Sequence, residues 1–222
     1  MTLILGPLVL LTGMLLRLPT DFFFPAQIAA LASQPARFAL AYGCVAASGL
    51  LLWPAILLLT QQIAPTYPGL ARWAGIFVLS GVVARTFHAG ADHMVARLVE
   101  AVGVTAATQI VSDTYGVFSI MQLVSPMIMA GWVLLAAGSY RAGVLGPLRA
   151  GALALMAGMP LGILKGTTIT GLVAVSGLCL ALIPLGMTLL RIPPHPAPRQ
   201  VLGWTAGIIA LVMVFFFLGT AG

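Results

Sequence analysis

Long apolar segments alternate with short polar or proline-rich connections along the whole chain. At a helical rise of 1.5 Å per residue, about 20 apolar residues cross a hydrocarbon core of roughly 30 Å. Runs of this kind occupy residues 2–19, 38–60, 69–88, 117–139, 147–164, 168–190 and 201–220. They are continuous rather than alternating, which favours helices over barrel strands. The pattern predicts an all-α integral membrane protein, with residues 1–222 forming a single domain built as a seven-helix transmembrane bundle.

Basic residues shorten two of the seven runs. Arg17 and Lys165 leave uninterrupted apolar stretches in 2–19 and 147–164 that are shorter than a full crossing. Long basic side chains reach the membrane interface by snorkelling, which we expect of both. If either segment is re-entrant, six spans remain. Small residues that allow close helix contact recur in the second and fifth runs, at Gly43, Ala46, Ala47, Gly49, Gly151, Ala154 and Gly158.

Composition supports the bilayer as the main solvent. The 222 residues are 61% hydrophobic and 6% charged, whereas a globular domain carries roughly 25% charged residues. The formal charge is +6, but the basic residues stand singly between apolar runs. This spacing favours contact with lipid head groups and argues against nucleic-acid binding. We therefore expect a multi-pass protein of the cell membrane with membrane lipid as a partner; the oligomeric state is left open.

The basic residues also bear on orientation. All ten Lys and Arg divide equally between the two sides of a seven-span chain, but the balance becomes unequal if Arg85 and Lys165 are intramembrane residues. Positive residues favour the cytoplasmic side, which places the N-terminus in the cytoplasm. Five basic residues then lie on that side, namely Arg72, Arg141, Arg149, Arg191 and Arg199, and three lie on the other, namely Arg17, Arg37 and Arg97.

Two polar stretches interrupt the apolar pattern. The link 17–37 contains LPTDFFFPAQ, and residues 85–116 hold three of the four acids and two of the three histidines. If the third helix continues past Arg85, then Arg85, His88 and Asp92 share one face, since residues three or four apart are neighbours. A second stripe holds His93, Arg97 and Glu100. Two hypotheses remain open: a pocket that buries Asp92 or Glu100, or a surface helix with solvated charges.

A carboxylic acid in an apolar pocket retains its proton because its ionised form is desolvated. Such an acid can protonate an alkene or epoxide, and aromatic faces stabilise the resulting cation. His88 and Asp92 have the spacing of a helical ligand pair, but a zinc site needs a third ligand, so we expect no metal or cofactor. The catalytic candidates are Asp21, His88, Asp92, Glu100 and Asp113. The substrate-binding candidates are Phe22, Phe23, Arg85, Phe87, Tyr115, Phe118 and Gln122.

In size, span number and acids at helix ends, the chain resembles the small bacterial membrane-bound terpene cyclases of natural product biosynthesis. The resemblance is architectural and transfers no catalytic position. It implies acid-initiated cyclisation of an isoprenoid, a hydrophobic small-molecule substrate. The alternative is a non-catalytic membrane protein, either a small transporter or an immunity, resistance or accessory subunit. Transport favours interrupted helices, for which Pro54, Pro126, Pro160 and Pro184 are candidates.

Overall fold

The computed structural model describes residues 1–114, 121–159, 162–192 and 197–220. Within these ranges all regular structure is helical, which confirms the all-α class. In chain order the helices are α1 (Thr2–Arg17), α2 (Phe24–Ser33), α3 (Pro35–Ile63), α4 (Pro68–Thr114), α5 (Met121–Arg141), α6 (Pro147–Ala154), the 3-10 turn η1 (Leu155–Gly158), α7 (Ile169–Leu190) and α8 (Pro198–Thr220). Each predicted run overlaps one of these helices, and α2 is an additional helix in the link 17–37.

Prolines mark where several of these helices begin. Proline stands at or next to the first position of α2, α3 and α6, and it is the first residue of α4 and α8. Its fixed φ suits the first helical turn, where its missing N–H has no intrahelical partner. Three of the four candidate prolines do not end their helices, because α3, α5 and α7 continue through Pro54, Pro126 and Pro184; Pro160 lies outside the described residues.

Three described helices, α3, α4 and α7, are long and apolar enough to cross a membrane. The fifth predicted segment, 147–164, is not one continuous helix. α6 and η1 end at Gly158, and Met159 is extended immediately before Pro160, as expected for a residue that precedes proline. The 8 residues of α6 and 4 of η1 extend about 20 Å, short of a full crossing. Among the described residues, this segment therefore supplies none of the candidate membrane spans.

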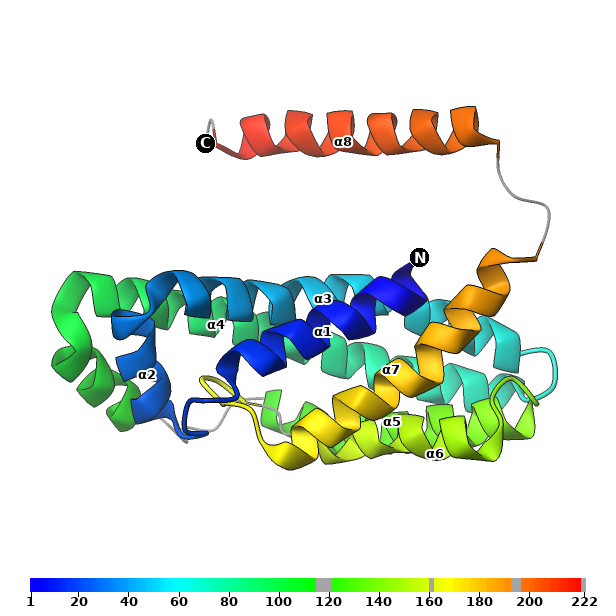
Figure 1. Cartoon of the computed structure of the whole chain (residues 1–222), viewed down its shortest axis with the longest axis horizontal. Helices are drawn as coiled ribbons and strands as arrows, with labels where there is room; N and C mark the ends of the chain where they lie inside the picture. The colour runs from blue at the N-terminus through cyan, green and yellow to red at the C-terminus, as the bar shows by residue number, and fades with distance from the viewer. Residues whose placement is uncertain (115–120, 160–161, 193–196, 221–222) are drawn as a thin grey trace. The chain divides into compact units, whose positions relative to one another are not determined.

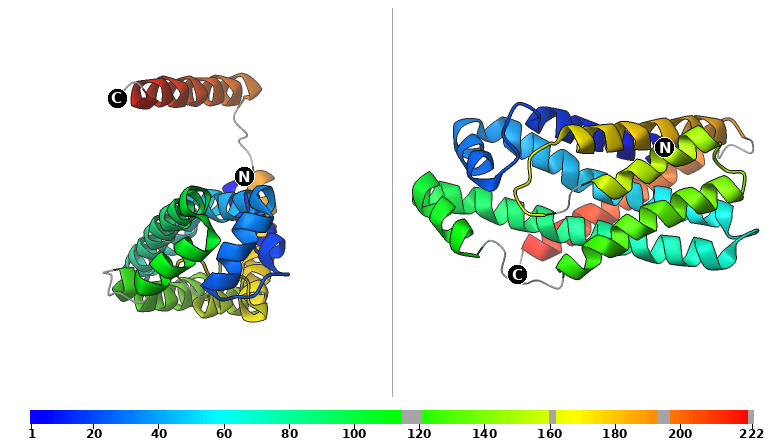
Figure 2. Two further views of the ribbon diagram at one scale, coloured as in Figure 1. Left: turned by 90° about the vertical axis from the view of Figure 1, so that its left-hand side faces the viewer. Right: turned by 90° about the horizontal axis from the view of Figure 1, so that it is seen from below.

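The described chain divides into two compact units, Met1–Met187 and Thr188–Gly222. In the first unit α1 packs on α3, α3 on α4, and α4 on α5 (Figure 1). The short helix α2 crosses the ends of α3 and α4 (Figure 2). On α7, a Cβ added to Gly177 would lie 2.5 Å from the backbone oxygen of Ala152 in α6, so these helices touch backbone to backbone. The second unit contains α8.

The longest helix, α4, bends at Gly103. Its 47 residues are interrupted there by φ 79° and ψ 169°, a backbone conformation that is essentially restricted to glycine. Beyond the bend, Ala107 and Val111 pack with Ile28 and Leu31 of α2 in a buried apolar cluster. The bend therefore lets the end of α4 turn onto α2.

Candidate functional site

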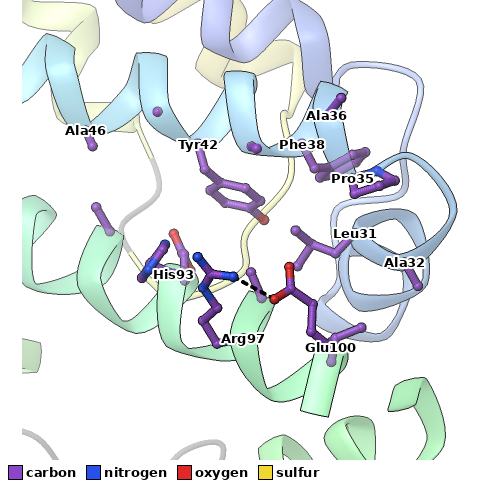
Figure 3. Close-up of a pocket in the computed structure, with 16 residues that line it drawn as sticks. Leu31, Ala32, Pro35, Ala36, Phe38, Tyr42, Ala46, His93, Arg97 and Glu100 are labelled. Atoms are coloured by element: carbon purple, nitrogen blue, oxygen red, sulfur yellow. Dashed lines mark hydrogen bonds and ion pairs between the residues drawn. The ribbon is translucent and has the colours of Figure 1, made fainter. Parts of the chain in front are cut away.

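An open groove of about 740 Å³ lies between α2, α3 and the middle of α4 (Figure 3). This volume falls within the range of roughly 300–1,000 Å³ found for small-molecule pockets. The walls are mainly apolar, with Leu31 from α2, Phe38 from α3 and Val99 from α4 separated by several alanines. Tyr42 points into the groove from α3 (Figure 3). The polar lining residues on α4 are Asp92, His93, Arg97 and Glu100.

Glu100 and Arg97 form an exposed ion pair at this groove. Arg97 Nη1 lies 2.7 Å from Glu100 Oε2, and the two side chains are 64% and 63% exposed. Exposed pairs of this kind contribute little, typically 0–1 kcal/mol, because water screens them. Glu100 therefore lines the groove without being buried in it.

A smaller cavity of about 50 Å³ adjoins the groove, with which it shares Tyr42, Ala89 and Asp92 as lining residues. Its remaining polar lining consists mostly of basic groups from α1, α4 and the segment after η1. We call it the basic chamber, and these groups are Arg17, Arg85, His88 and Lys165. The two cavities meet at Asp92, so one carboxyl group faces both an apolar groove and a basic chamber.

Asp92 is buried, with 8% of its surface exposed. Its Oδ1 accepts a hydrogen bond of 2.7 Å from the backbone N–H of Leu164. Leu164 is fully buried and has φ 51°, in the left-handed region that non-glycine residues rarely adopt. The Asp92 carboxyl thus binds a strained turn of the segment 162–168 and brings it against α4.

The same segment is attached to α1 and to the link that follows it. Thr167 Oγ1 donates a 2.7 Å hydrogen bond to the carbonyl oxygen of Met14. The Gly166 N–H donates a 2.9 Å hydrogen bond to the carbonyl oxygen of Phe22. Residues far apart in sequence therefore meet around the basic chamber, and the segment after η1 forms part of its wall.

Arg17 is the most deeply buried cation of the site, at 6% exposure. Its Nη1 donates a 2.8 Å hydrogen bond to the carbonyl oxygen of Lys165, and its guanidinium lies 5.0 Å from the centre of the Tyr42 ring. The Tyr42 hydroxyl in turn donates to Gln27 Oε1 at 3.1 Å. The expectation that Arg17 snorkels to an interface is wrong, because polar partners inside the fold hold it there.

The structure confirms that α4 continues past Arg85 and that the three residues predicted to share one helical face do so. Arg85, His88 and Asp92 all line the basic chamber, one or two helical turns apart. His88 Nδ1 is buried without a hydrogen-bond partner. Within the described chain Arg85 makes no hydrogen bond or ion pair. The second stripe, which includes His93, lines the groove instead.

The link around Asp21 does not reach either cavity. Asp21 is exposed, and its backbone carbonyl accepts a 2.6 Å hydrogen bond from Gln27 Nε2. Phe22 lies 5.8 Å, ring centre to nitrogen, from Lys165 Nζ, and Phe23 is 59% exposed. Asp21, Phe22 and Phe23 therefore line neither the groove nor the basic chamber beside Asp92.

Other predicted residues also lie apart from Asp92. Asp113 is exposed and accepts a 2.8 Å hydrogen bond from Gln109 of the same helix. Phe87 is 49% exposed and contacts the His88 ring edge-on, outside the chamber lining. Tyr115 and Phe118 lie outside the described residues, as does the side chain of Gln122 in α5.

Sequence reasoning missed three chamber residues and the group that binds Asp92. Arg17, Tyr42 and Lys165 stand singly in or beside apolar runs, and the partner of Asp92 is the backbone of Leu164. An ionisable residue at membrane depth is a functional candidate by default, and this rule points to Arg17 and Lys165. No sequence signal marks a backbone N–H donor 72 residues away from its acceptor.

In the described part of the chain no group of three or more His, Cys, Asp or Glu residues is placed to hold a metal ion. No protein-family model, curated protein or solved structure matches the chain significantly.

Proposed function

We propose that the chain binds a lipid-like or isoprenoid molecule in the groove and that Asp92 transfers a proton to or from it. The observation that carries this proposal is the position of Asp92, buried where the apolar groove meets the basic chamber. A pocket with apolar walls and a few convergent polar groups is the usual form of a small-molecule site.

The length of α4 supports access from the bilayer. The part of α4 before the bend at Gly103, Pro68–Val102, corresponds to about 52 Å of helix, more than the hydrocarbon thickness of roughly 30 Å. If its apolar beginning, 69–88, crosses the membrane, residues 89–100 that line the groove lie near one interface. A hydrocarbon chain then enters the groove from the membrane while its polar end stays near water.

Acid-initiated cyclisation is the reaction that the architectural resemblance to the membrane-bound terpene cyclases implies. Asp92 would protonate an alkene or epoxide, the carbon skeleton would close, and a proton lost from a neighbouring carbon would complete the reaction. The cation would need to form on the groove side, beside Phe38 and Tyr42, because Arg17 and Arg85 oppose positive charge in the chamber.

The test uses solvent deuterium. The full chain in phosphatidylcholine nanodiscs is incubated in D₂O with a panel of polyprenyl alkenes, and carbon-bound deuterium is measured by mass spectrometry. We expect incorporation by the wild type and at least a 100-fold loss in Asp92→Asn, whose amide cannot supply the proton. The matched control Asp113→Asn, on the same helix, should retain activity.

The second candidate is a non-catalytic lipid-binding protein, either a small transporter or an immunity, resistance or accessory subunit. The open groove favours it, since binding and release need no chemistry. Under this alternative the panel binds to the wild type with no deuterium incorporation, and Asp92→Asn changes affinity alone. That result would overturn the proposed proton transfer while leaving the groove as the binding site.

A further inference from the structure

We propose that the basic chamber binds an oxyanion, either phosphate or carboxylate, that forms the head group of an amphiphile. The proposal rests on the proposed function only for the apolar part of that molecule, which occupies the adjoining groove. It narrows the substrate class from a lipid-like molecule to an amphiphile with an acidic head.

The charge balance of the chamber is the first argument. Arg17, Arg85 and Lys165 line it, and Asp92 is its one acidic lining residue. All four acids and all ten Lys and Arg of the chain lie within the described residues, so this balance is complete. Of the other three acids, Asp21 is exposed, Glu100 pairs with Arg97 and Asp113 contacts Gln109, and none of them lines the chamber.

Unpartnered donors are the second argument. Arg17 is more than nine-tenths buried, and its Nε atom has no hydrogen-bond partner. His88 Nδ1 is likewise buried and unpaired, and Arg85 has no ion pair within the described chain. A buried guanidinium N–H without a partner is costly, and a charge-assisted bond from Arg17 Nε to an oxyanion would satisfy it. The planar guanidinium groups are well suited to the oxygens of phosphate or carboxylate.

The size and position of the chamber are the third argument. A volume of about 50 Å³ holds a compact group, not a hydrocarbon chain. The adjoining groove of about 740 Å³ is lined mainly by apolar residues and is fit for the chain. Tyr42 and Asp92 line both cavities, so a single molecule can place its head in the chamber and its tail in the groove.

The direct test compares three ligands that share a twelve-carbon chain. Dodecyl phosphate, dodecan-1-ol and dodecyltrimethylammonium are titrated onto the full chain in phosphatidylcholine nanodiscs, and the dissociation constants are measured. We expect dodecyl phosphate to bind at least about tenfold more tightly than the alcohol, and the cation to bind most weakly. Equal affinities for phosphate and alcohol would overturn the proposal without any variant being made.

Variants then locate the anion. Arg85→Met should reduce the preference for phosphate over alcohol to about unity, whereas Arg85→Lys should retain part of it. Arg72→Met is the matched control, because Arg72 is an exposed arginine of the same helix that does not line the chamber. A phosphate preference that Arg85→Met and Arg85→Lys leave unchanged in folded protein would place the anion elsewhere and overturn the assignment.

Two further arms separate the source of the anion and the role of the groove. Inorganic phosphate should compete with dodecyl phosphate if a free anion suffices. Phosphatidic acid added to the nanodiscs should compete if a bilayer lipid is the ligand. Competition by either supports an oxyanion site.

The variant Ala39→Trp tests the groove, because the larger side chain fills it; the binding of dodecyl phosphate and of dodecan-1-ol should weaken alike. If Ala39→Trp weakens the binding of neither ligand, the hydrocarbon chain does not bind in the groove. A retained preference for phosphate over alcohol would still support the basic chamber as the anion site.

Discussion

One carboxyl group, that of Asp92, links the stability of the site to its chemistry. Asp92 accepts a hydrogen bond from the backbone N–H of Leu164, a buried residue with positive φ. A backbone strained in this way persists only where the surroundings hold it, and it typically costs about 1–3 kcal/mol. The Asp92 oxygen therefore helps to keep the segment 162–168, and with it Lys165, at the wall of the basic chamber.

Replacing Asp92 by Ala should loosen that segment. The change leaves the Leu164 N–H buried without an acceptor, at a cost of about 1–3 kcal/mol in the free energy of unfolding. Asp92→Asn retains an amide oxygen and should lose less. Hydrogen exchange measured by mass spectrometry should show faster exchange of 162–168 in Asp92→Ala than in Asp92→Asn. The exposed Glu100→Ala serves as the control, and equal exchange in all three variants would refute the anchoring role.

The face of α4 that carries Arg85, His88 and Asp92 was predictable, because helical periodicity alone brings residues three or four apart together. The partners of this face were not. Arg17 and Lys165 reach it from other parts of the chain, and their burial depends on how α1 and the segment after η1 pack. Long-range packing of this kind leaves no periodic signal in the sequence.

At the element scale, glycines show the same limit of sequence reasoning. Gly43 and Gly151 were expected to permit close helix contact, yet a Cβ added to either would meet nothing within 4 Å. The close approaches occur elsewhere: a Cβ on Gly131 of α5 would lie 2.8 Å from the backbone nitrogen of Val78 in α4. Which glycine faces a neighbour depends on helix rotation, which small-residue spacing does not determine.

Gly103 and Gly90 of α4 allow a matched test of the bend. Neither would place a Cβ within 4 Å of other atoms, but only Gly103 has positive φ. Gly103→Ala should therefore destabilise the fold by about 1–3 kcal/mol through backbone strain. Gly90→Ala should stabilise it by about 0.5–1 kcal/mol, as alanine does in a helix interior. Unfolding midpoints measured in one detergent would compare them, and equal shifts would argue against a bend at Gly103.

At the scale of the whole molecule, the all-helical class follows from composition and run length, and the number of crossings does not. α3, α4 and α7 have the length and hydropathy of spans, whereas 147–164 ends its helix early. The predicted cytoplasmic N-terminus places the turn between α3 and α4 in the cytoplasm, provided that α1 and α3 both cross. The groove then lies toward the opposite side, because α4 continues from that turn through residues 89–100.

This topology predicts opposite accessibility for the two parts of α4. In a background with Cys44 and Cys179 replaced by Ser, Gly69→Cys and Ala101→Cys are about 48 Å apart along the helix, more than the hydrocarbon thickness. A membrane-impermeant maleimide added to intact cells should label Ala101→Cys, and Gly69→Cys only after permeabilisation. Ile76→Cys, exposed on the apolar part of α4, should resist labelling in both cases. Labelling of Gly69→Cys and Ala101→Cys from the same side would show that α4 does not cross the membrane between them, and the bilayer route into the groove would then be excluded.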